Sequence, residues 1–110
     1  MPRTPTRLAG PLAVPLVGAI ATVITVPALQ KFIVRHIHIE NPTGAAVTFT
    51  LTIGLDVAAA RIYDAISIAG GAAVDFFCYH VLEVTEVMKT YASASPALVL
   101  VINGDVCTLG

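Results

Sequence analysis

Two histidines of this 110-residue chain have the spacing of a metal-ligand pair. His36 and His38 lie in the run Lys31–Glu40, which we expect to form a β-strand. Side chains at i and i+2 of a strand share a face, so the two imidazoles could hold one zinc ion. Glu40 continues that face, but a third ligand near the pair is missing, because His80 is remote in sequence. We therefore expect an exposed polar face, with no metal and no other cofactor, and keep His36 and His38 as the metal-binding candidates.

The acidic residues do not indicate a catalytic pair. Asp56 and Asp64 flank a short alanine-rich segment, and Glu83 and Glu86 fall in an expected turn. General acid–base catalysis needs a concave pocket and shifted pKa values, neither of which the sequence supplies. The chain has no Gly-x-Ser-x-Gly elbow, P-loop or Gly-x-Gly-x-x-Gly motif. We expect no catalytic or cofactor-binding residues and a protein that is not an enzyme.

The two cysteines do not form a redox or metal motif. Cys78 and Cys107 are far apart and each lies in an apolar run. This spacing is neither a zinc knuckle nor a Cys-x-x-Cys pair. We expect two unpaired structural cysteines, since free cysteine packs as a small hydrophobic residue, with a disulfide as the open alternative.

The composition points to a chain that buries surface against a partner. Apolar residues make up 56% of the sequence and charged residues only 12%, against about 25% charged residues in typical soluble domains. The net charge is −1 and there is no basic cluster, so we expect no nucleic-acid partner. The shortage of solvating charge predicts a homo-oligomer, with a trimer as the favoured state.

The uncharged stretch Leu8–Gln30 is long enough to span a bilayer. Pro11, Pro15 and Pro27 interrupt it, and Thr22–Val26 is β-branched throughout. Proline breaks a helix and β-branched residues favour strands. Two arginines before the stretch also imitate a secretory signal. We expect neither a membrane span nor a signal peptide, and no membrane partner.

Residues 1–18 are expected to form an extended N-terminal arm, because they are rich in proline and lack strand periodicity. The arm is too apolar to remain in solvent, so we expect its apolar side chains to be interface residues: Leu8, Leu12, Val14 and Leu16. We predict that the arm packs on a neighbouring subunit or a larger particle and not on its own domain. Removing Met1–Pro15 should then leave the domain folded.

Residues 19–110 are expected to form one all-β domain. The predicted strands are Ile20–Val26, Lys31–Glu40, Val47–Ile53, Ile62–Ile68, Val74–Leu82, Val87–Tyr91, Leu98–Ile102 and Val106–Leu109. Asp56–Arg61 is the only helix-like patch, Asn41–Gly44 is a turn, and Asn103-Gly104 is a turn or a bulge. Seven or eight short strands at close spacing predict a single antiparallel β-sandwich, either jelly-roll or immunoglobulin-like.

Alternation along two strands predicts the centre of the core: Ile37, Ile39, Phe49 and Leu51. In Lys31–Glu40, strict alternation places Val34 with His36 on the opposite face. Arg35 then shares the isoleucine face, where it needs an acid across the sheet or a place at the sheet edge. The threonines of Val47–Ile53 are expected to face solvent.

The order of several segments resembles the small β-sandwich structural proteins encoded among head and tail genes of phages that infect actinobacteria. The segments that carry this resemblance are Val26-Pro27-Ala28, Ile33–Asn41, Val47–Gly54, Arg61–Ile68, Val81-Leu82-Glu83, Tyr91-Ala92-Ser93 and Ile102–Val106. Together they cover roughly Ile20 to Val106. Family members often have glycine in the turn after Leu-Glu, where this chain has Val84-Thr85.

The resemblance implies a non-enzymatic virion protein, assembled in the host cytoplasm. A capsid decoration (minor capsid) protein that binds the major capsid protein is the first expectation, because a small charge-poor sandwich suits a subunit that seats on a shell. A minor tail protein, or a module on the particle that binds a host glycan or receptor, is the alternative. The resemblance implies no catalytic residues.

Overall fold

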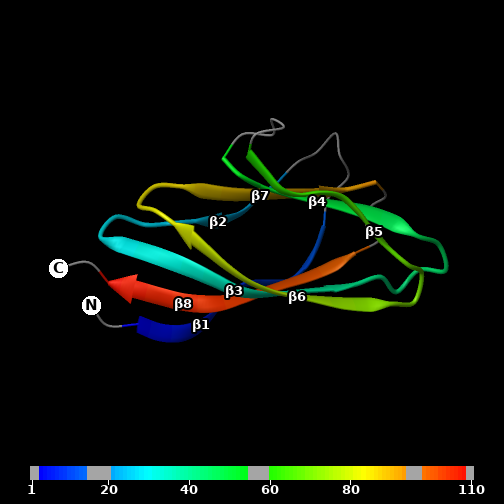
Figure 1. The fold of residues 1–110 in the computed structure, drawn as a ribbon, viewed down its shortest axis with the longest axis horizontal. Helices are drawn as coiled ribbons and strands as arrows, with labels where there is room; N and C mark the ends of the chain where they lie inside the picture. Colours follow the sequence, from blue (N-terminus) through cyan, green and yellow to red (C-terminus); the bar gives the residue numbers. More distant parts are fainter. Residues whose placement is uncertain (1–2, 15–20, 55–59, 94–97, 109–110) are drawn as a thin grey trace.

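The computed structural model describes residues 3–14, 21–54, 60–93 and 98–108, which form eight β-strands. In chain order these are β1 (Arg3–Ala13), β2 (Ala21–Thr25), β3 (Gln30–Glu40), β4 (Val47–Ile53), β5 (Arg61–Ile68), β6 (Ala73–Leu82), β7 (Val87–Ala92) and β8 (Val99–Thr108). The predicted antiparallel β-sandwich is confirmed, with two four-stranded sheets that form the two layers of Figure 1.

The strand order makes this sandwich a jelly roll. One sheet has the order β1-β8-β3-β6 and the other β2-β7-β4-β5. Each strand of the first half pairs with its counterpart counted from the other end: β1 with β8, β2 with β7, β3 with β6 and β4 with β5, all antiparallel. One long antiparallel ribbon folded over itself gives this arrangement, which is that of the eight-stranded jelly roll. The immunoglobulin-like alternative is therefore not the one adopted.

The six predicted strands from Ile20–Val26 to Val87–Tyr91 correspond to β2–β7, with ends that differ by a few residues. The last two predicted strands are wrong as separate elements. They form one continuous strand, β8, so Asn103-Gly104 is not a turn. The helix-like patch Asp56–Arg61 lies mostly outside the described residues, and its last residue begins β5.

The N-terminal segment is a strand of the sandwich, which corrects the expected arm. Arg3–Ala13 forms β1 and pairs with β8 along most of its length. β1 lies at the edge of its sheet. An edge strand tolerates Pro5 and Pro11, because the N–H that proline lacks has no neighbour to bond there. The proline content that argued against a strand thus indicates an edge position.

The expected interface residues of this segment contact the chain's own core. Val14 is fully buried in the core, and its N–H donates to the Leu98 carbonyl. Leu8 and Leu12 are half-buried and pack against the core, while Leu16 lies outside the described residues. The expectation that another chain covers Val14 is wrong. Because β1 pairs with β8 and Val14 lies in the core, we now expect removal of Met1–Pro15 to destabilise the domain.

The predicted core residues are buried together, but on opposite sheets. Ile37, Ile39, Phe49 and Leu51 are all fully buried in one cluster. β3 and β4 do not pair, because the connection between them crosses from one sheet to the other. The two isoleucines therefore face Phe49 and Leu51 across the sandwich, where the side chains of the two inner faces interdigitate.

Asn41 fixes this crossing connection. Its buried Nδ2 donates to the carbonyls of Ala45 and Ile68, and its Oδ1 accepts from the Thr43 N–H and hydroxyl. The Asn41 backbone also bonds to Gly71 and Ala72 of the β5–β6 connection. The side chain thus satisfies its polar groups without water and ties the two connections together.

A bulge in β3 decides which of its side chains face the core. The register shifts between Val34 and His36 against both neighbours, β6 and β8, so that Arg35 is an extra residue opposite β8. Val34 is fully buried before the bulge and Ile37 after it, although they are three residues apart. The expectation that Val34 shares a face with His36 is therefore wrong, because the bulge shifts the alternation by one residue.

Gly104 of β8 allows β3 to approach at this bulge. It pairs with Val34, and a Cβ at Gly104 would collide with the Ile33 carbonyl oxygen and lie 2.9 Å from the Ile33 carbonyl carbon. The Cβ would also lie 3.0 Å from Cδ1 of Leu8 on the other side. Only glycine fits between the two neighbouring strands at this point.

The threonine face of β4 is not the expected solvent face. Thr50 and Thr52 are buried. The Thr50 hydroxyl accepts from the Ala65 N–H, and the Thr52 hydroxyl donates to the Gly54 carbonyl. Their polar groups therefore bond to neighbouring backbone instead of water.

Over the described residues, no helix has the length and apolar character needed to cross a bilayer.

Substitution of Phe49 tests the core directly. Phe49→Ala removes a fully buried ring and should lower the free energy of unfolding by about 3–5 kcal/mol. Urea denaturation followed by circular dichroism measures the loss. A change below about 1 kcal/mol would place Phe49 outside the core.

Gly104→Ala tests the close approach at the bulge. The added methyl group has no space between β3 and β1, so we expect a loss of about 1–3 kcal/mol in unfolding free energy. Gly44→Ala is the matched control, because a Cβ there meets nothing within 4 Å. Equal stability of the two variants in urea denaturation would show that Gly104 is not sterically required.

Candidate functional site

The outward side chains of β3 and β6 form one polar and aromatic surface, which we call the outer face. It comprises Arg35, His36 and His38 from β3 and Asp75, Phe77, Tyr79 and Val81 from β6. The bulge at Arg35 turns both histidines outward, and the regular alternation of β6 turns its odd-numbered residues the same way. Within the described strands, β6 is the edge of its sheet.

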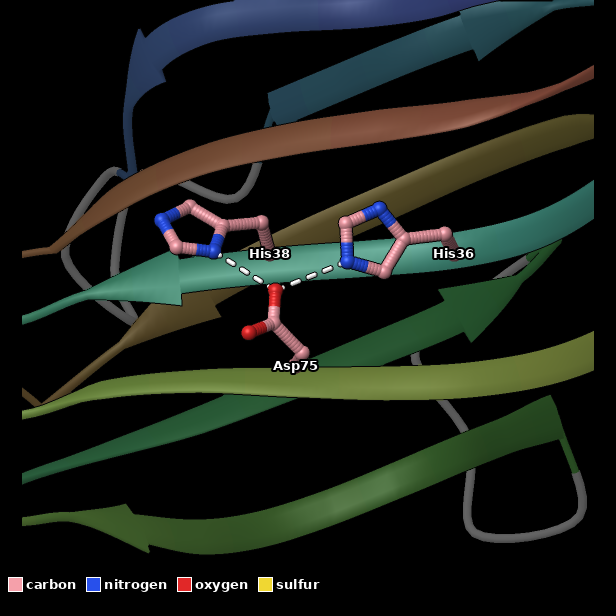
Figure 2. Close-up of side chains that lie close together, drawn as sticks. All are labelled: His36, His38 and Asp75. Atoms are coloured by element: carbon pink, nitrogen blue, oxygen red, sulfur yellow. Dashed lines mark hydrogen bonds and ion pairs between the residues drawn. The ribbon is translucent and has the colours of Figure 1, made fainter.

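His36, His38 and Asp75 are joined by two short hydrogen bonds. Oδ1 of Asp75 lies 2.7 Å from Nε2 of His36 and 2.7 Å from Nδ1 of His38. Figure 2 shows both rings turned toward this one oxygen, with the histidines on β3 and the aspartate on the neighbouring strand. Asp75 is the direct cross-strand partner of His38, which places the two side chains on the same face within reach of one another. Each imidazole donates one N–H to the carboxylate.

Two further residues hold His36 in place. The Asn103 side chain on β8 lies 3.0 Å from Nδ1 of His36, so Nδ1 accepts while Nε2 donates to Asp75. The Phe77 ring stacks on the imidazole with centroids 4.9 Å apart. His36 is therefore fixed on three sides by Asp75, Asn103 and Phe77.

The two histidines lower the pKa of Asp75. The hydrogen bond from His38 contributes most, followed by that from His36, and the small desolvation of the carboxyl opposes them. A carboxylate that accepts hydrogen bonds is stabilised in its charged form. Asp75 therefore presents a full negative charge between two imidazoles at neutral pH.

The sequence identified two of these three residues. His36 and His38 were recognisable from their i, i+2 spacing on a strand. Asp75 was missed because its position beside them depends on the pairing of β3 with β6, two strands separated by β4 and β5. The expected lack of a third group near the pair is therefore wrong. The remote His80 lies on the inner side of β6 and does not join the cluster.

Arg35 forms an ion pair with an acidic residue of the neighbouring strand. Its guanidinium lies 3.2 Å from Oδ2 of Asp105 on the adjacent β8, which confirms the predicted partner across the sheet. The guanidinium also lies over the Tyr79 ring, 5.7 Å from the centroid. Arg35 is half-exposed, so the ion pair contributes about 0–1 kcal/mol. The ion pair and the Tyr79 ring both contact the guanidinium and restrain the Arg35 side chain.

Large apolar side chains of β6 are left in solvent. Phe77 is 83% exposed, Tyr79 61% and Val81 39%. They alternate along an edge strand, so they form a continuous row. Exposed apolar rows of this kind mark contact surfaces in soluble proteins.

A second cluster, which we call the edge cluster, lies between β5 and β6, each of which is an edge strand of one of the two sheets. The Tyr63 ring on β5 packs against Phe76 with centroids 4.9 Å apart, and its hydroxyl lies 3.4 Å from Nε2 of His80. Burial, with a smaller effect of the neighbouring Cys78, raises the pKa of Tyr63 to about 12. The Tyr63 hydroxyl therefore stays protonated across the physiological range.

This edge cluster does not have the electrostatics of a nucleophilic site. Burial raises the pKa of the Cys78 thiol and lowers the pKa of His80. A reactive cysteine needs the opposite, a thiolate beside a cationic group. Cys78 and Cys107 are both free, as expected, and Cys78 acts here as a packing residue.

Tyr63 should make the stability depend on pH in the alkaline range. Its pKa in the folded chain is above the ordinary tyrosine value of 10.0, so its contribution to stability is fully present below pH 10 and is lost as the pH rises toward 12. Urea denaturation between pH 8 and 12 measures this dependence. Tyr63→Phe, which keeps the ring, should lose less stability over the range. An identical decline in both proteins would contradict the assignment.

The described residues enclose no pocket. Comparisons of the chain with protein-family models, with curated proteins and with solved structures found no match.

Proposed function

We propose that this chain is a non-enzymatic structural subunit of a bacteriophage particle, a capsid decoration protein that forms a homo-oligomer and binds the shell. The observation that carries the proposal is the exposed apolar row of Phe77, Tyr79 and Val81 on the edge strand β6. An isolated soluble domain with so few charged residues has little to keep such a row in solvent. Contact with a second copy of the chain removes it from water.

The chemistry of the outer face favours a protein partner. Aromatic and arginine side chains are enriched in protein interfaces, and here Phe77, Tyr79 and Arg35 lie side by side. Each is held by a neighbour before contact, Phe77 on His36 and Arg35 on Asp105. Side chains that are already ordered lose less conformational entropy on association, which favours binding.

Fold and sequence support a virion role by analogy. The jelly roll recurs in viral capsid and lectin domains, and a fold shared by many proteins supports a function only as an analogy. The chain also resembles small phage structural proteins through segments such as Ile33–Asn41 and Ile102–Val106. With 12% charged residues, its composition suits a subunit that is covered on assembly.

Self-association through the outer face can be measured on the purified chain. Light scattering at micromolar concentration should give a homo-oligomer, with a trimer as the expected state. Phe77→Ser combined with Tyr79→Ser should yield a folded monomer, because both substitutions replace exposed side chains. Leu29→Ser is the control, since Leu29 is also exposed but lies between β2 and β3. A monomeric wild-type chain, or a double variant that assembles like wild type, would contradict this part of the proposal.

The place of the chain in the particle requires a separate measurement. Quantitative mass spectrometry of purified particles should find it in numbers comparable to the major capsid protein. A few copies per particle would indicate the minor tail protein or receptor-binding alternative. Absence from particles that contain the other structural proteins would show that the virion assignment is wrong.

A further inference from the structure

The side chains of His36, His38 and Asp75 bring three potential metal-ligand atoms together. All three ligand atoms lie within 4.8 Å of one another on the outer face. Two imidazole nitrogens and one carboxylate oxygen are a frequent ligand set for zinc and related divalent ions. Magnesium and calcium prefer oxygen ligands throughout, so they do not fit this set.

The geometry needs only a small adjustment to hold an ion. Asp75 Oδ1 now lies 2.7 Å from each imidazole nitrogen. Ligands at about 2.0–2.2 Å from a tetrahedral zinc ion are about 3.4 Å apart. The two imidazole nitrogens, which lie within 4.8 Å of one another, must come closer while the carboxylate oxygen moves away from both. The three side chains are partly exposed, with 26–44% of each in solvent, which leaves room for these side-chain rotations.

Neighbouring side chains would hold the His36 ring in place if it bound a metal ion. When Nε2 binds a metal, Nδ1 carries the ring proton and needs an acceptor. Asn103 already lies 3.0 Å from Nδ1, and a half-turn of its amide presents the carbonyl oxygen to that proton. Phe77 stacks on the ring and restrains its orientation. Asn103 can thus stabilise either state of His36.

We infer that His36, His38 and Asp75 form a binding site for one divalent transition-metal ion, with Zn²⁺ as the best match. Three protein ligands leave a fourth position, which water fills in the isolated chain. The carboxylate supplies one negative charge and the two imidazoles bind as neutral ligands. The inference does not depend on the proposed virion role, since all three ligands come from a single chain.

The competing explanation is a purely structural hydrogen-bonded group, in which Asp75 accepts two N–H bonds and binds no metal. The two explanations differ in a measurable way. A structural group loses stability when Asp75 is replaced but has no saturable affinity for Zn²⁺. A metal site binds Zn²⁺ in a one-to-one ratio and is stabilised by it.

The test uses the full-length chain without an affinity tag, treated with a chelator and titrated with ZnCl₂ in a calorimeter. We expect one Zn²⁺ per chain. Asp75→Asn and His38→Gln should each weaken binding by about tenfold or more, since even residues that only orient a ligand cost 10–100-fold in metal affinity. His80→Gln is the matched control, because this third histidine lies in the edge cluster and should leave the affinity unchanged.

Cobalt provides an independent readout of the ligands. Co²⁺ added to the metal-free chain should give visible absorption bands without a sulfur-to-metal charge-transfer band, because Cys78 and Cys107 are not ligands. Zn²⁺ should then displace the more weakly bound Co²⁺ and remove the bands. If a substitution unfolds the chain, the site is located in the wild type by the changes in amide NMR shifts on addition of Zn²⁺. The largest changes should centre on His36, His38 and Asp75. No saturable binding below millimolar Zn²⁺, equal affinity in Asp75→Asn and wild type, or shifts centred elsewhere would overturn the inference.

Discussion

The close approach of β3 to β8 at Gly104 is the constraint on which the two faces of the first sheet depend. Because Gly104 has no side chain, the Ile33 carbonyl can lie against it and Arg35 can bulge out of the ladder. One extra residue shifts the alternation of β3 by one position. Val34 and Ile37 then both face the core, and His36 and His38 both face outward.

Both functional proposals follow from this shift. The outward histidines meet Asp75 on β6, and the stacked pair of His36 and Phe77 links the candidate metal site to the exposed apolar row. Arg35, left out of the ladder by the bulge, bonds to Asp105 and lies over Tyr79. The bulge in the inner strand β3 thus re-aims side chains toward solvent while the core on the other side stays continuous. The polar and aromatic groups gather on one surface because they come from one bulged strand and its edge neighbour.

Local pattern predicted most strands and the centre of the core, because alternation and turn residues act over a few positions. It could not give strand pairing, which depends on residues far apart in the chain. Asp75 was therefore not foreseen, and the choice between a jelly-roll and an immunoglobulin-like strand order stayed open. Strict alternation failed at Arg35, where a glycine on another strand determines the bulge. The proline content of residues 1–18 favours an arm because proline is unfavourable inside a sheet, and only the tertiary structure shows that β1 lies at an edge.

The central claim is that β3 exchanges its faces at Arg35. Nuclear Overhauser spectra of the chain with labelled methyl groups test it most directly. We expect contacts from the methyl groups of both Val34 and Ile37 to core methyl groups of the opposite sheet, such as those of Leu51 and Met88. If Ile37 shows these contacts while Val34 contacts only outward side chains, β3 alternates without a bulge, which would contradict the exchange of faces at Arg35.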